Sequence, residues 1–472
     1  MADEQELRRL ADLLDRPGTR AHFVGVGGAG MAPLAAIAAD RGWRVSGCDL
    51  GQSEVTAQLQ ARGVPTALGH DPSHLADQEL LVVSAAVPSD LPEVAAAAAR
   101  GLPVVKRARL VGALTRRTRA LCVAGTAGKT TTTAMCAVGL LGAGLDPSAL
   151  VGASVPGIGV GGRSGRGDIF VVEADEFDRT FLSLRPRVAV VTNVEADHLD
   201  YYGSREAIDQ AFREFLALVP PEGRVVICHD DPGARAVAPD GALSYGATSG
   251  ADWLAEEIGP TEPGGTRMAV RGPDRRRLEV RLRLPGRHNA LNALAAIAAC
   301  DQLGADPDAV ARALGEFEGA ARRFERKGEA RGVAVYDDYG HHPTKVRATL
   351  AAARQRAGRG RVWCVFQPHT YHRTMSLFGD FANAFGDADR VLVLDIYSPA
   401  GREQPIADVD ARRLVAAMPH PAARYAASFD EAAAVVAREA VAGDLVVTMG
   451  AGDVTRLARP LLERLAEEPE RR

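Results

Sequence analysis

The chain has 472 residues, enough for about three domains of ordinary size. Its composition, 46% hydrophobic and 25% charged, is typical of a globular protein and excludes collagen-like, coiled-coil and wholly disordered chains. The 60 Asp and Glu nearly balance the 56 Lys and Arg, which excludes a protein whose main task is to coat nucleic acid or anionic lipid.

The first residues and the cysteines predict a place in the cytoplasm. Met1–Leu14 is charged and has the pattern of an amphipathic helix, without the apolar core of a signal peptide. Alanine-rich stretches such as Leu291–Cys300 are too short to cross a bilayer. The six cysteines are scattered, which is typical of reduced, buried thiols. We therefore expect a cytoplasmic protein with no membrane and no nucleic-acid partner. As to oligomeric state, a monomer or a homodimer is expected.

Short apolar runs alternate with alanine-rich helical stretches along the whole chain. Strands that are apolar throughout and alternate with helices predict parallel sheets covered on both faces, so the expected fold class is α/β. The expected strands are His22–Gly25, Arg44–Cys48, Leu80–Ser84, Ala120–Ala124, Ile169–Glu173, Val188–Thr192, Arg224–Cys228, Val333–Asp337, Val362–Phe366, Arg390–Leu394 and Asp444–Met449.

Two polar stretches divide this pattern. An arginine-rich segment near Thr115–Thr118 reads as a linker before a new strand, and a charged, glycine-containing segment lies at Phe317–Arg326. Ser244–Leu284 is rich in Gly, Pro and Arg, and there we expect a small antiparallel addition with strands at Met268–Val270 and Leu278–Leu284. The predicted domains are residues 1–117, 118–318 and 319–472.

The first strand runs into a glycine-rich turn, Gly25-Val-Gly27-Gly28-Ala29-Gly30-Met31, and then into a helix. Glycines at this spacing let the backbone approach a diphosphate, which lies on the amides of the helix N-terminus. Asp49 follows at the end of the next strand, where a carboxylate can accept hydrogen bonds from a sugar hydroxyl. The pattern predicts a Rossmann-like domain and by itself keeps a NAD-dependent oxidoreductase open.

A second glycine-rich turn is more informative. Strand Ala120–Ala124 leads into Gly125-Thr126-Ala127-Gly128-Lys129-Thr130-Thr131, a short form of the phosphate loop. Amides and the helix dipole bind phosphate oxygens, Lys129 reaches the outer phosphates, and Thr130 offers a hydroxyl to Mg²⁺. Lys129 is one of only four lysines in an arginine-rich chain, and its compact ammonium suits an amide cradle. The turn predicts a central P-loop domain.

Acidic residues follow the next two predicted strands. Glu173-Ala-Asp175-Glu176 ends one strand, and Asn193-Val-Glu195-Ala-Asp197-His198 ends the other. Ligands in parallel α/β sheets bind beyond the carboxyl ends of strands, so both clusters are expected to face the phosphate loop. A hard cation that bridges ATP phosphates takes a few oxygen ligands. Thr130 and Glu173 are the best candidates, and His198 is a candidate ligand of a second ion.

The last third of the chain carries two strand ends crowded with polar rings and cations. Strand Val333–Tyr336 ends in Asp337-Asp338-Tyr339-Gly340-His341-His342, and another strand ends in Gln367-Pro368-His369-Thr370-Tyr371-His372-Arg373. Such residues are poor packing material, and they suit recognition of a carboxylate and an amine.

In this order, these motifs resemble the Mur ligase family of peptidoglycan synthesis over nearly the whole chain. The similarity also includes His288-Asn289-Ala290-Leu291-Asn292 and Arg322–Glu325. It implies a UDP-sugar site at the first glycine-rich turn, ATP in the central domain, and a Rossmann-like third domain that contacts amino acid and nucleotide. A polar residue, often His, is usual in the family where this chain has Ala127.

The resemblance implies a role for each matching residue. Asn292 would contact adenine, Asp337 or Asp338 the ribose, and Arg323 the γ-phosphate. Tyr339, His341, His369 and Arg373 would lie near the incoming amino acid and the muramate arm. His70 and Ser84 are added as UDP-sugar contacts. The implied catalytic residues are Lys129, Glu173, His198, Arg323 and His341.

The resemblance implies an ATP-dependent ligase that uses Mg²⁺ and joins L-alanine to the carboxylate of UDP-N-acetylmuramate through an acyl phosphate. The alanine-adding branch of the family is the one the sequence resembles most. Another ligase of the family, such as a muropeptide-recycling one, stays an alternative. A NAD-dependent oxidoreductase is more remote, because it would leave the second glycine-rich turn unused.

Overall fold

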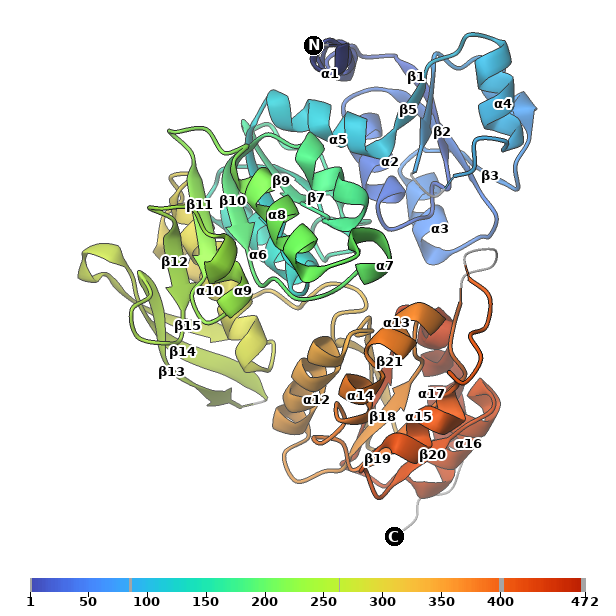
Figure 1. The fold of residues 1–472 in the computed structure, drawn as a ribbon, viewed down its shortest axis with the longest axis vertical. Coiled ribbons are helices and arrows are strands. Elements are labelled where there is room, and N and C mark those ends of the chain that lie inside the picture. The colour runs from blue at the N-terminus through green and yellow to red at the C-terminus, as the bar shows by residue number, and fades with distance from the viewer. Residues whose placement is uncertain (1, 85–86, 263, 399–402, 468–472) are drawn as a thin grey trace. The chain divides into compact units, whose positions relative to one another are not determined.

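The computed structural model describes residues 2–84, 87–262, 264–398 and 403–467, which form three sheets flanked by helices (Figure 1). The α/β class expected from the sequence is confirmed. The chain divides into two compact units. The first comprises Met1–Glu256, Ala269–Val280 and Leu291–Phe317, and the second comprises Glu257–Met268, Arg281–Ala290 and Glu318–Arg472. The predicted boundaries of three domains stay predictions.

The N-terminal sheet has five strands in the order β3-β2-β1-β4-β5, all parallel. The central strands are the apolar runs that the sequence singled out, and the short edge strands β3 and β5 lack such a run. The elements are α1 (Ala2–Leu14), β1 (Arg20–Val24), α2 (Met31–Asp40), β2 (Arg44–Asp49), α3 (Glu54–Ala61), β3 (Thr66–Leu68), η1 (Pro72–Leu75), β4 (Leu80–Val83), α4 (Pro92–Ala99), β5 (Val104–Lys106) and α5 (Arg107–Arg116).

The amphipathic first helix is confirmed. Leu7, Leu10 and Leu14 are buried at helical spacing, and α1 packs against α5. The linker expected near Thr115–Thr118 is wrong in part, because Thr115 is a buried residue of α5. Its hydroxyl donates to Gly112 O and accepts from Arg185 N, both at about 3 Å. The polar residues here belong to the end of a helix, where the Thr115 hydroxyl is hydrogen-bonded inside the protein, and not to a linker.

The central sheet has ten strands in the order β15-β14-β13-β12-β11-β10-β6-β9-β7-β8. Pairing is parallel from β9 through β6, β10, β11 and β12 to β13, and β8 pairs antiparallel with β7. The strands are β6 (Arg119–Ala124), β7 (Ser148–Leu150), β8 (Gly162–Arg163), β9 (Ile169–Glu173), β10 (Pro186–Val191), β11 (Arg224–Cys228), β12 (Leu243–Gly246), β13 (Trp253–Thr261), β14 (Gly265–Arg271) and β15 (Arg277–Leu282).

Helices of the central region connect these strands. They are α6 (Lys129–Gly142), η2 (Phe177–Ser183), α7 (Leu199–Tyr202), α8 (Arg205–Leu216), α9 (Pro232–Val237), η3 (Pro273–Arg275), α10 (Arg287–Asp301) and α11 (Pro307–Gly315). The strand expected at Met268–Val270 lies within β14, and the one expected at Leu278–Leu284 is β15, which ends at Leu282. The longer strand β13 was not expected, because its sequence alternates less clearly between apolar and polar residues.

The third sheet has six strands in the order β16-β17-β21-β18-β19-β20, and only the edge strand β16 pairs antiparallel. Its elements are β16 (Glu325–Ala330), β17 (Val333–Asp338), α12 (Pro343–Ala357), β18 (Val362–Phe366), α13 (Tyr371–Ser376), α14 (Phe378–Ala382), β19 (Arg390–Val393), α15 (Ala411–Ala417), β20 (Ala423–Tyr425), α16 (Phe429–Glu439), β21 (Leu445–Met449), η4 (Asp453–Leu457) and α17 (Ala458–Glu467).

Side chains of one strand divide between two cores in the third sheet. In β18, Val362, Cys364 and Phe366 belong to the core with α12, α14 and α15, whereas Trp363 and Val365 belong to the core with α16 and α17. Successive side chains point to opposite faces of a strand, and here both faces are covered by helices. The continuous apolar run in the sequence follows from this double burial.

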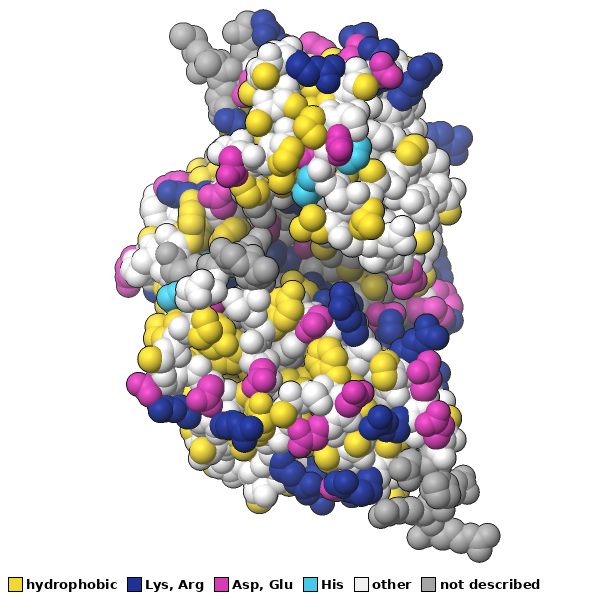
Figure 2. Space-filling view, turned by 90° about the vertical axis from the view of Figure 1, so that its right-hand side faces the viewer, with side chains coloured by type: hydrophobic (Ala, Val, Ile, Leu, Met, Phe, Trp, Pro, Cys, Tyr) yellow, Lys and Arg dark blue, Asp and Glu magenta, His cyan; other side chains and the backbone are white. Residues whose placement is uncertain are grey.

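Among the described residues, no helix is both long and apolar enough to span a bilayer. Figure 2 shows acidic and basic side chains interspersed over the face that it presents. The balanced composition of the sequence thus corresponds to a mixed charge distribution on that face.

One buried carboxylate joins the starts of two neighbouring strands in the third sheet. Asp444 immediately precedes β21, and its Oδ2 accepts hydrogen bonds from Arg361 Nη2 at 2.7 Å and from Trp363 Nε1 at 3.0 Å. Arg361 immediately precedes β18 and Trp363 lies within it, and β18 pairs with β21. Because the carboxylate is buried and serves several donors, its loss leaves them without an acceptor.

We expect Asp444→Ala to lower the local free energy of unfolding of β18 and β21 by about 3 kcal/mol. Hydrogen–deuterium exchange of these two strands measures the effect. Asp168→Ala is the matched control, because Arg119 contacts Asp168 through two nitrogens at 2.8 and 3.0 Å on an exposed surface. Its expected effect is below about 1 kcal/mol. Equal loss of protection in the two variants would contradict the assignment.

Candidate active site

The second glycine-rich turn joins the end of β6 to the start of α6, as the sequence predicts. Gly128 has φ 83°, in the left-handed region, and a Cβ there would lie 2.8 Å from Asn292 Oδ1. Only glycine meets both conditions. A buried helix that begins directly after such a turn is a ready anion-binding site at its N-terminus.

The register of the sheet brings three strand ends to this turn. Val123 in β6 pairs with Glu173 in β9, and Ala124 pairs with Val191 in β10. The three strands β6, β9 and β10 therefore end at the same edge of the sheet. The segments that follow β9 and β10 meet the phosphate loop at one edge of the sheet, as expected.

Asn193, which follows β10, fixes the shape of the phosphate loop. Its Oδ1 accepts a hydrogen bond from Ala127 N at 2.7 Å, and its carbonyl accepts one from Thr126 N at 3.0 Å. The amides of Thr126 and Ala127 already have acceptors within the protein. The part of the loop best suited to bind phosphate is therefore the N-terminus of α6. The phosphate contacts expected of Gly125, Thr126, Ala127 and Thr131 stay predictions.

Lys129 lies among carboxylates at the start of α6. Its Nζ donates to Gly125 O at 2.6 Å and to the two carboxylate oxygens of Glu176 at 2.7 and 3.0 Å. Burial by itself lowers the pKa of Lys129, but the charges of Glu176 and Asp175 outweigh it, and the net shift of the pKa is upward. The ammonium is thus charged and already faces anionic oxygens.

Two of the three predicted metal ligands are in contact. Thr130 Oγ1 donates to Glu173 Oε2 at 3.2 Å, and the other Glu173 oxygen accepts a hydrogen bond from Gly152 N. A hydroxyl and a carboxylate oxygen beside a phosphate loop are the donors that Mg²⁺ prefers. The described residues therefore fit this cation.

His198 has contacts of another kind. It precedes α7 with φ 55°, its ring centroid lies 4.9 Å from that of Phe177, and its Nε2 lies 3.9 Å from Asp197 Oδ2. Its role as a metal ligand and catalytic residue stays a prediction. Asn292, the predicted adenine contact, lies in α10, and its Oδ1 accepts a hydrogen bond from Thr132 Oγ1 at 3.2 Å. That contact places α10 beside the phosphate loop.

The first glycine-rich turn is held by the end of β2. Gly25 N and Val26 N donate to Cys48 O at 2.8 and 3.0 Å, and Gly27 N donates to Asp49 Oδ2 at 2.9 Å. Gly28 and Ala29 are exposed at the tip of the turn, and Met31 begins α2. Asp49 was expected to bind a sugar hydroxyl, and the structure gives it a second task in shaping the turn.

The two remaining UDP-sugar candidates lie elsewhere in the same sheet. His70 Nδ1 lies 3.4 Å from Cys48 Sγ and 3.2 Å from Glu93 Oε1, so this nitrogen is directed toward buried groups. Ser84 directly follows β4. The UDP-sugar contacts of His70 and Ser84 stay predictions.

Arg107, a residue that the sequence analysis missed, connects the two glycine-rich turns electrostatically. It begins α5, and its Nε donates to Gly30 O at 2.9 Å. A Cβ at position 30 would lie 2.6 Å from that nitrogen, so a larger residue there would displace the Arg107 side chain. Burial lowers the pKa of Arg107, and the charges of Asp175 and Glu173 act in the opposite direction. An arginine that follows a short strand gave no signal in the sequence.

The residues expected to recognise the amino acid form one cluster in the second unit. His341 lies 5.0 Å from Tyr339 and 6.0 Å from His369, measured between ring centroids. Arg373 Nη1 donates to His369 O at 3.1 Å. Tyr397, which the sequence analysis did not single out, stacks on His369 at 5.7 Å.

Two neighbouring arginines flank Tyr339. The Cζ atoms of Arg322 and Arg323 lie 4.9 and 4.8 Å from the centroid of its ring. Arg322 also donates to Asp337 Oδ2 at 3.3 Å and to Gly450 O at 2.6 Å. Arg322 therefore braces the ends of β17 and β21. The predicted contact of Arg323 with the γ-phosphate stays a prediction.

The two candidate ribose ligands are buried and engaged within the third sheet. Asp337 accepts a hydrogen bond from Thr448 Oγ1 at 2.8 Å. Asp338 accepts from Phe324 N at 2.8 Å on one oxygen and from Gly340 N at 2.7 Å on the other. Burial raises the pKa of Asp338. These contacts favour an internal role, and a ribose contact stays a prediction.

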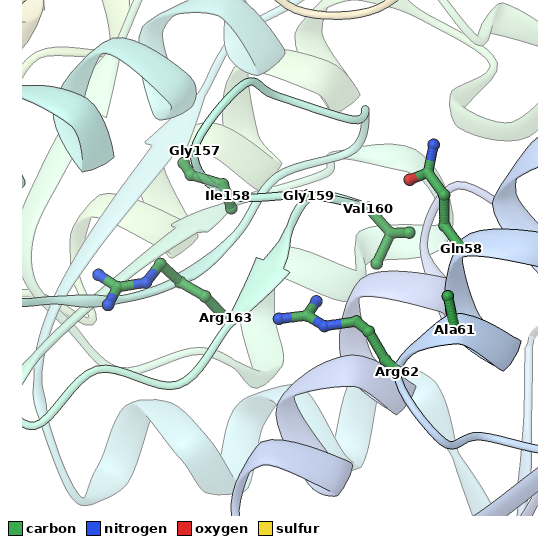
Figure 3. A pocket seen from close by; sticks show the side chains of 8 residues that line it. All are labelled: Gln58, Ala61, Arg62, Gly157, Ile158, Gly159, Val160 and Arg163. Atoms are coloured by element: carbon green, nitrogen blue, oxygen red, sulfur yellow. The ribbon is translucent and has the colours of Figure 1, made fainter.

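A cavity of about 410 Å³ lies apart from these residues in the first unit (Figure 3). It is bounded by the end of α3 and by the segment 157–163, and Arg62 Nη1 donates to Gly162 O at 2.9 Å beside it. None of the predicted site residues lines it. It is therefore a separate feature from the two glycine-rich turns.

Three family models match successive parts of the chain. The Mur ligase family catalytic domain matches residues 20–119, the Mur ligase middle domain matches 123–300, and the Mur ligase glutamate ligase domain matches 322–452. The chain belongs to the Mur ligase family. The resemblance of the motifs is thus confirmed, and the central match of this Mur ligase contains its phosphate loop.

Curated relatives of this Mur ligase match it over nearly its whole length. The UDP-N-acetylmuramate–L-alanine ligase of Paenarthrobacter aurescens (strain TC1) is 47% identical over 453 residues, which are 94% of this chain and 97% of that protein. The protein of the same name from Acidothermus cellulolyticus is 45% identical over 471 residues, which are 98% of each chain.

Solved structures agree with this Mur ligase in fold. UDP-N-acetylmuramate–alanine ligase MurC from Thermotoga maritima has a TM-score of 0.81 at 29% identity, covering 94% of this chain and 98% of that one. A murein peptide ligase from Psychrobacter arcticus has a TM-score of 0.72 at 26% identity, covering 96% and 100%.

Asp338→Asn tests whether this carboxylate is a brace or a ribose ligand. The amide would place a donor opposite one of the two backbone amides, so we expect faster hydrogen–deuterium exchange around Phe324 and Gly340. Asp395→Asn, at an exposed residue two positions after β19, is the control and should leave that exchange unchanged. A raised KM for ATP with unaltered exchange would instead favour the ribose contact.

Proposed function

We propose that this Mur ligase is an ATP-dependent ligase that joins L-alanine to the carboxylate of UDP-N-acetylmuramate. The proposal is supported by relatives of that name that are 45–47% identical over at least 94% of the chain. The observation that carries the chemistry is the contact of Lys129 and Thr130 with Glu176 and Glu173 at a phosphate loop. A Mur-type ligase for a muropeptide stays the nearest alternative.

ATP would bind with its phosphates at the start of α6. The Lys129 ammonium, which faces Glu176 in this structure, would transfer its contacts to the outer phosphates. Thr130 and Glu173 would hold Mg²⁺, which supplies positive charge to the phosphate oxygens when bound. Asn193 keeps the loop in shape through Ala127 N and thus fixes where Lys129 begins its helix.

The UDP-sugar would bind at the first glycine-rich turn. Gly28 and Ala29 are exposed there, at the N-terminus of α2, and a diphosphate suits such a place. Arg107 donates a hydrogen bond to Gly30 O, and its guanidinium also interacts with the negative charges of Asp175 and Glu173. We infer that this guanidinium orients the carboxylate arm of the sugar toward the acidic end of β9, because a carboxylate gains an arginine partner there.

A carboxylate does not condense with an amine in water, because hydroxide is a poor leaving group. Attack of the muramate carboxylate on the γ-phosphorus of ATP would give an acyl phosphate and ADP. The alanine amine would then attack the acyl carbon and expel phosphate. Lys129 and, by its predicted role, Arg323 offset the charge on the transferred oxygens. His198, His341 and His369 stay candidate acceptors of the amine proton.

Lys129→Ala is expected to lower the rate of ADP formation by roughly 100-fold or more, because it removes the cation that faces the outer phosphates. Binding of UDP-N-acetylmuramate, measured by calorimetry, should stay nearly unchanged, since the first glycine-rich turn lies in another sheet. Lys327→Ala is the matched control, because that lysine pairs with Glu325 at 3.0 Å on the edge strand β16. Loss of sugar binding together with turnover would contradict the separation of the two sites.

A panel assay tests the reaction itself. Purified protein with ATP and Mg²⁺ is given each UDP-muramyl precursor and each amino acid in turn, and ADP is the readout. We expect ADP release only when UDP-N-acetylmuramate and L-alanine are both present. Release at the same rate without the sugar would show a plain ATPase, and preference for a peptide would favour the muropeptide-ligase alternative.

A further inference from the structure

A largely buried cluster of metal-ligand side chains lies on one face of the N-terminal sheet, and the proposed ligase reaction makes no use of it. His22 lies in β1 and Cys48 in β2, and parallel pairing places Ser46 beside His22 and Cys48 beside Val24. Residues of the same parity share a face of a sheet, so His22 and Cys48 point the same way. Two elements that cover this face, η1 and α4, contribute His74 and Glu93.

The four side chains converge on one point. Each of His22, Cys48, His74 and Glu93 offers one ligand atom, and these atoms all lie within 4.8 Å of one another. Cys48 Sγ lies 3.4 Å from Glu93 Oε1, as does His74 Nδ1. Ligand atoms around a tetrahedral zinc ion lie roughly 3.3–3.8 Å apart, so small side-chain rotations suffice to close the site.

Three buried polar atoms in this cluster have no hydrogen-bond partner. They are His22 Nε2, His74 Nδ1 and Glu93 Oε2. His22 is 1% exposed and Glu93 is fully buried. A buried carboxylate oxygen and a buried ring nitrogen without partners are costly, so a native protein is expected to supply one. A cation that accepts lone pairs from all three atoms satisfies them together.

The outer contacts of the cluster also suit a metal site. His22 Nδ1 shares a hydrogen bond of 2.9 Å with Ser46 Oγ, which leaves Nε2 as the ligand atom. Glu93 Oε1 accepts a hydrogen bond from Asp71 N at 3.0 Å, which fixes the carboxylate. Ligating histidines and carboxylates are generally held by such partners.

We propose that His22, Cys48, His74 and Glu93 bind one Zn²⁺ ion in a closed, structural site of the N-terminal domain. Two nitrogens, one sulfur and one oxygen are the mixed donor set that Zn²⁺ accepts and Mg²⁺ does not. On binding, the Cys48 thiol releases its proton to solvent, and the thiolate and the Glu93 carboxylate together offset the charge of the ion.

The site would act on the first glycine-rich turn through the backbone of Cys48. The carbonyl of this residue accepts hydrogen bonds from Gly25 N and Val26 N, and Asp49 next to it holds Gly27 N. An ion that fixes Cys48 therefore also fixes the turn proposed to bind the UDP-sugar. Because all four ligands come from the protein, the ion is expected to stabilise this turn and to take no part in the reaction.

Cobalt substitution tests the site on the full-length chain. The chain is stripped of metal with a chelator, desalted into excess Mg²⁺, and titrated with Co²⁺. We expect a thiolate-to-cobalt charge-transfer band and the visible bands of tetrahedral Co²⁺, both saturating at one ion per chain and both removed by one equivalent of Zn²⁺. Independently, mass spectrometry of the protein purified without a metal-affinity tag should find zinc near one equivalent.

Three variants assign the ligands. Cys48→Ala should abolish the charge-transfer band, whereas Cys122→Ala, a control in the central sheet at an equally buried cysteine, should retain it. Ser46→Ala keeps all four ligands and removes only the hydrogen bond to His22. We expect it to weaken metal affinity about ten- to a hundredfold without unfolding the domain.

The proposal is overturned if Co²⁺ gives no charge-transfer band, if the band persists in Cys48→Ala, or if zinc is far below one equivalent and cannot be loaded. Those outcomes would show instead that Glu93 is held without a metal ion, by hydrogen bonds such as those from Cys48 and Asp71. All these readouts are spectroscopic or analytical, so they are independent of the ligase activity.

Discussion

The candidate active site depends on one partly buried ammonium group, that of Lys129, held where three strands end. The charges of Glu176 and Asp175 outweigh burial and raise the pKa of Lys129, and Glu176 provides two oxygens within 3.0 Å. The same group would bind the outer phosphates of ATP. In the described structure the carboxylate of Glu176 compensates the charge of this cation. By our proposal, the phosphates of ATP do so during the reaction. Asn193 and the register of β6 with β9 and β10 hold the arrangement in place.

The first glycine-rich turn shows a different use of the same backbone pattern. The spacing of its glycines fits a dinucleotide as well as a UDP-sugar, and our proposal assigns the sugar to it. Its neighbours agree with that assignment. Arg107 contacts Gly30, and its guanidinium interacts with the charges of Glu173 and Asp175 at the end of β9. The turn is thereby connected electrostatically to the residues beside the phosphate loop. A cofactor site for hydride transfer has no need of such a connection.

Much of the site could be predicted because it consists of strand ends. An apolar run followed by glycines or carboxylates marks the edge of a parallel sheet at which ligands bind, and this reasoning placed Thr130 beside Glu173. It did not reveal the partners that shape the site. Asn193 and Glu176 stand in motifs that the sequence analysis quoted, but only the folded chain shows that one binds the loop amide and the other the lysine. Asp338 illustrates the opposite case, since its position favoured a ligand role and its contacts favour a brace.

The sequence by itself determined the α/β class, the main strands and the order of the two glycine-rich turns, because each depends on residues close together in the chain. Burial on both faces leaves a continuous apolar run, and a phosphate loop needs its glycines and lysine at fixed spacing. Only the tertiary structure decided which distant side chains meet. Arg107 approaches Gly30, and His22, Cys48, His74 and Glu93 converge although the first and the last are 71 positions apart in the chain. Such contacts follow from strand order and register, which no local pattern encodes.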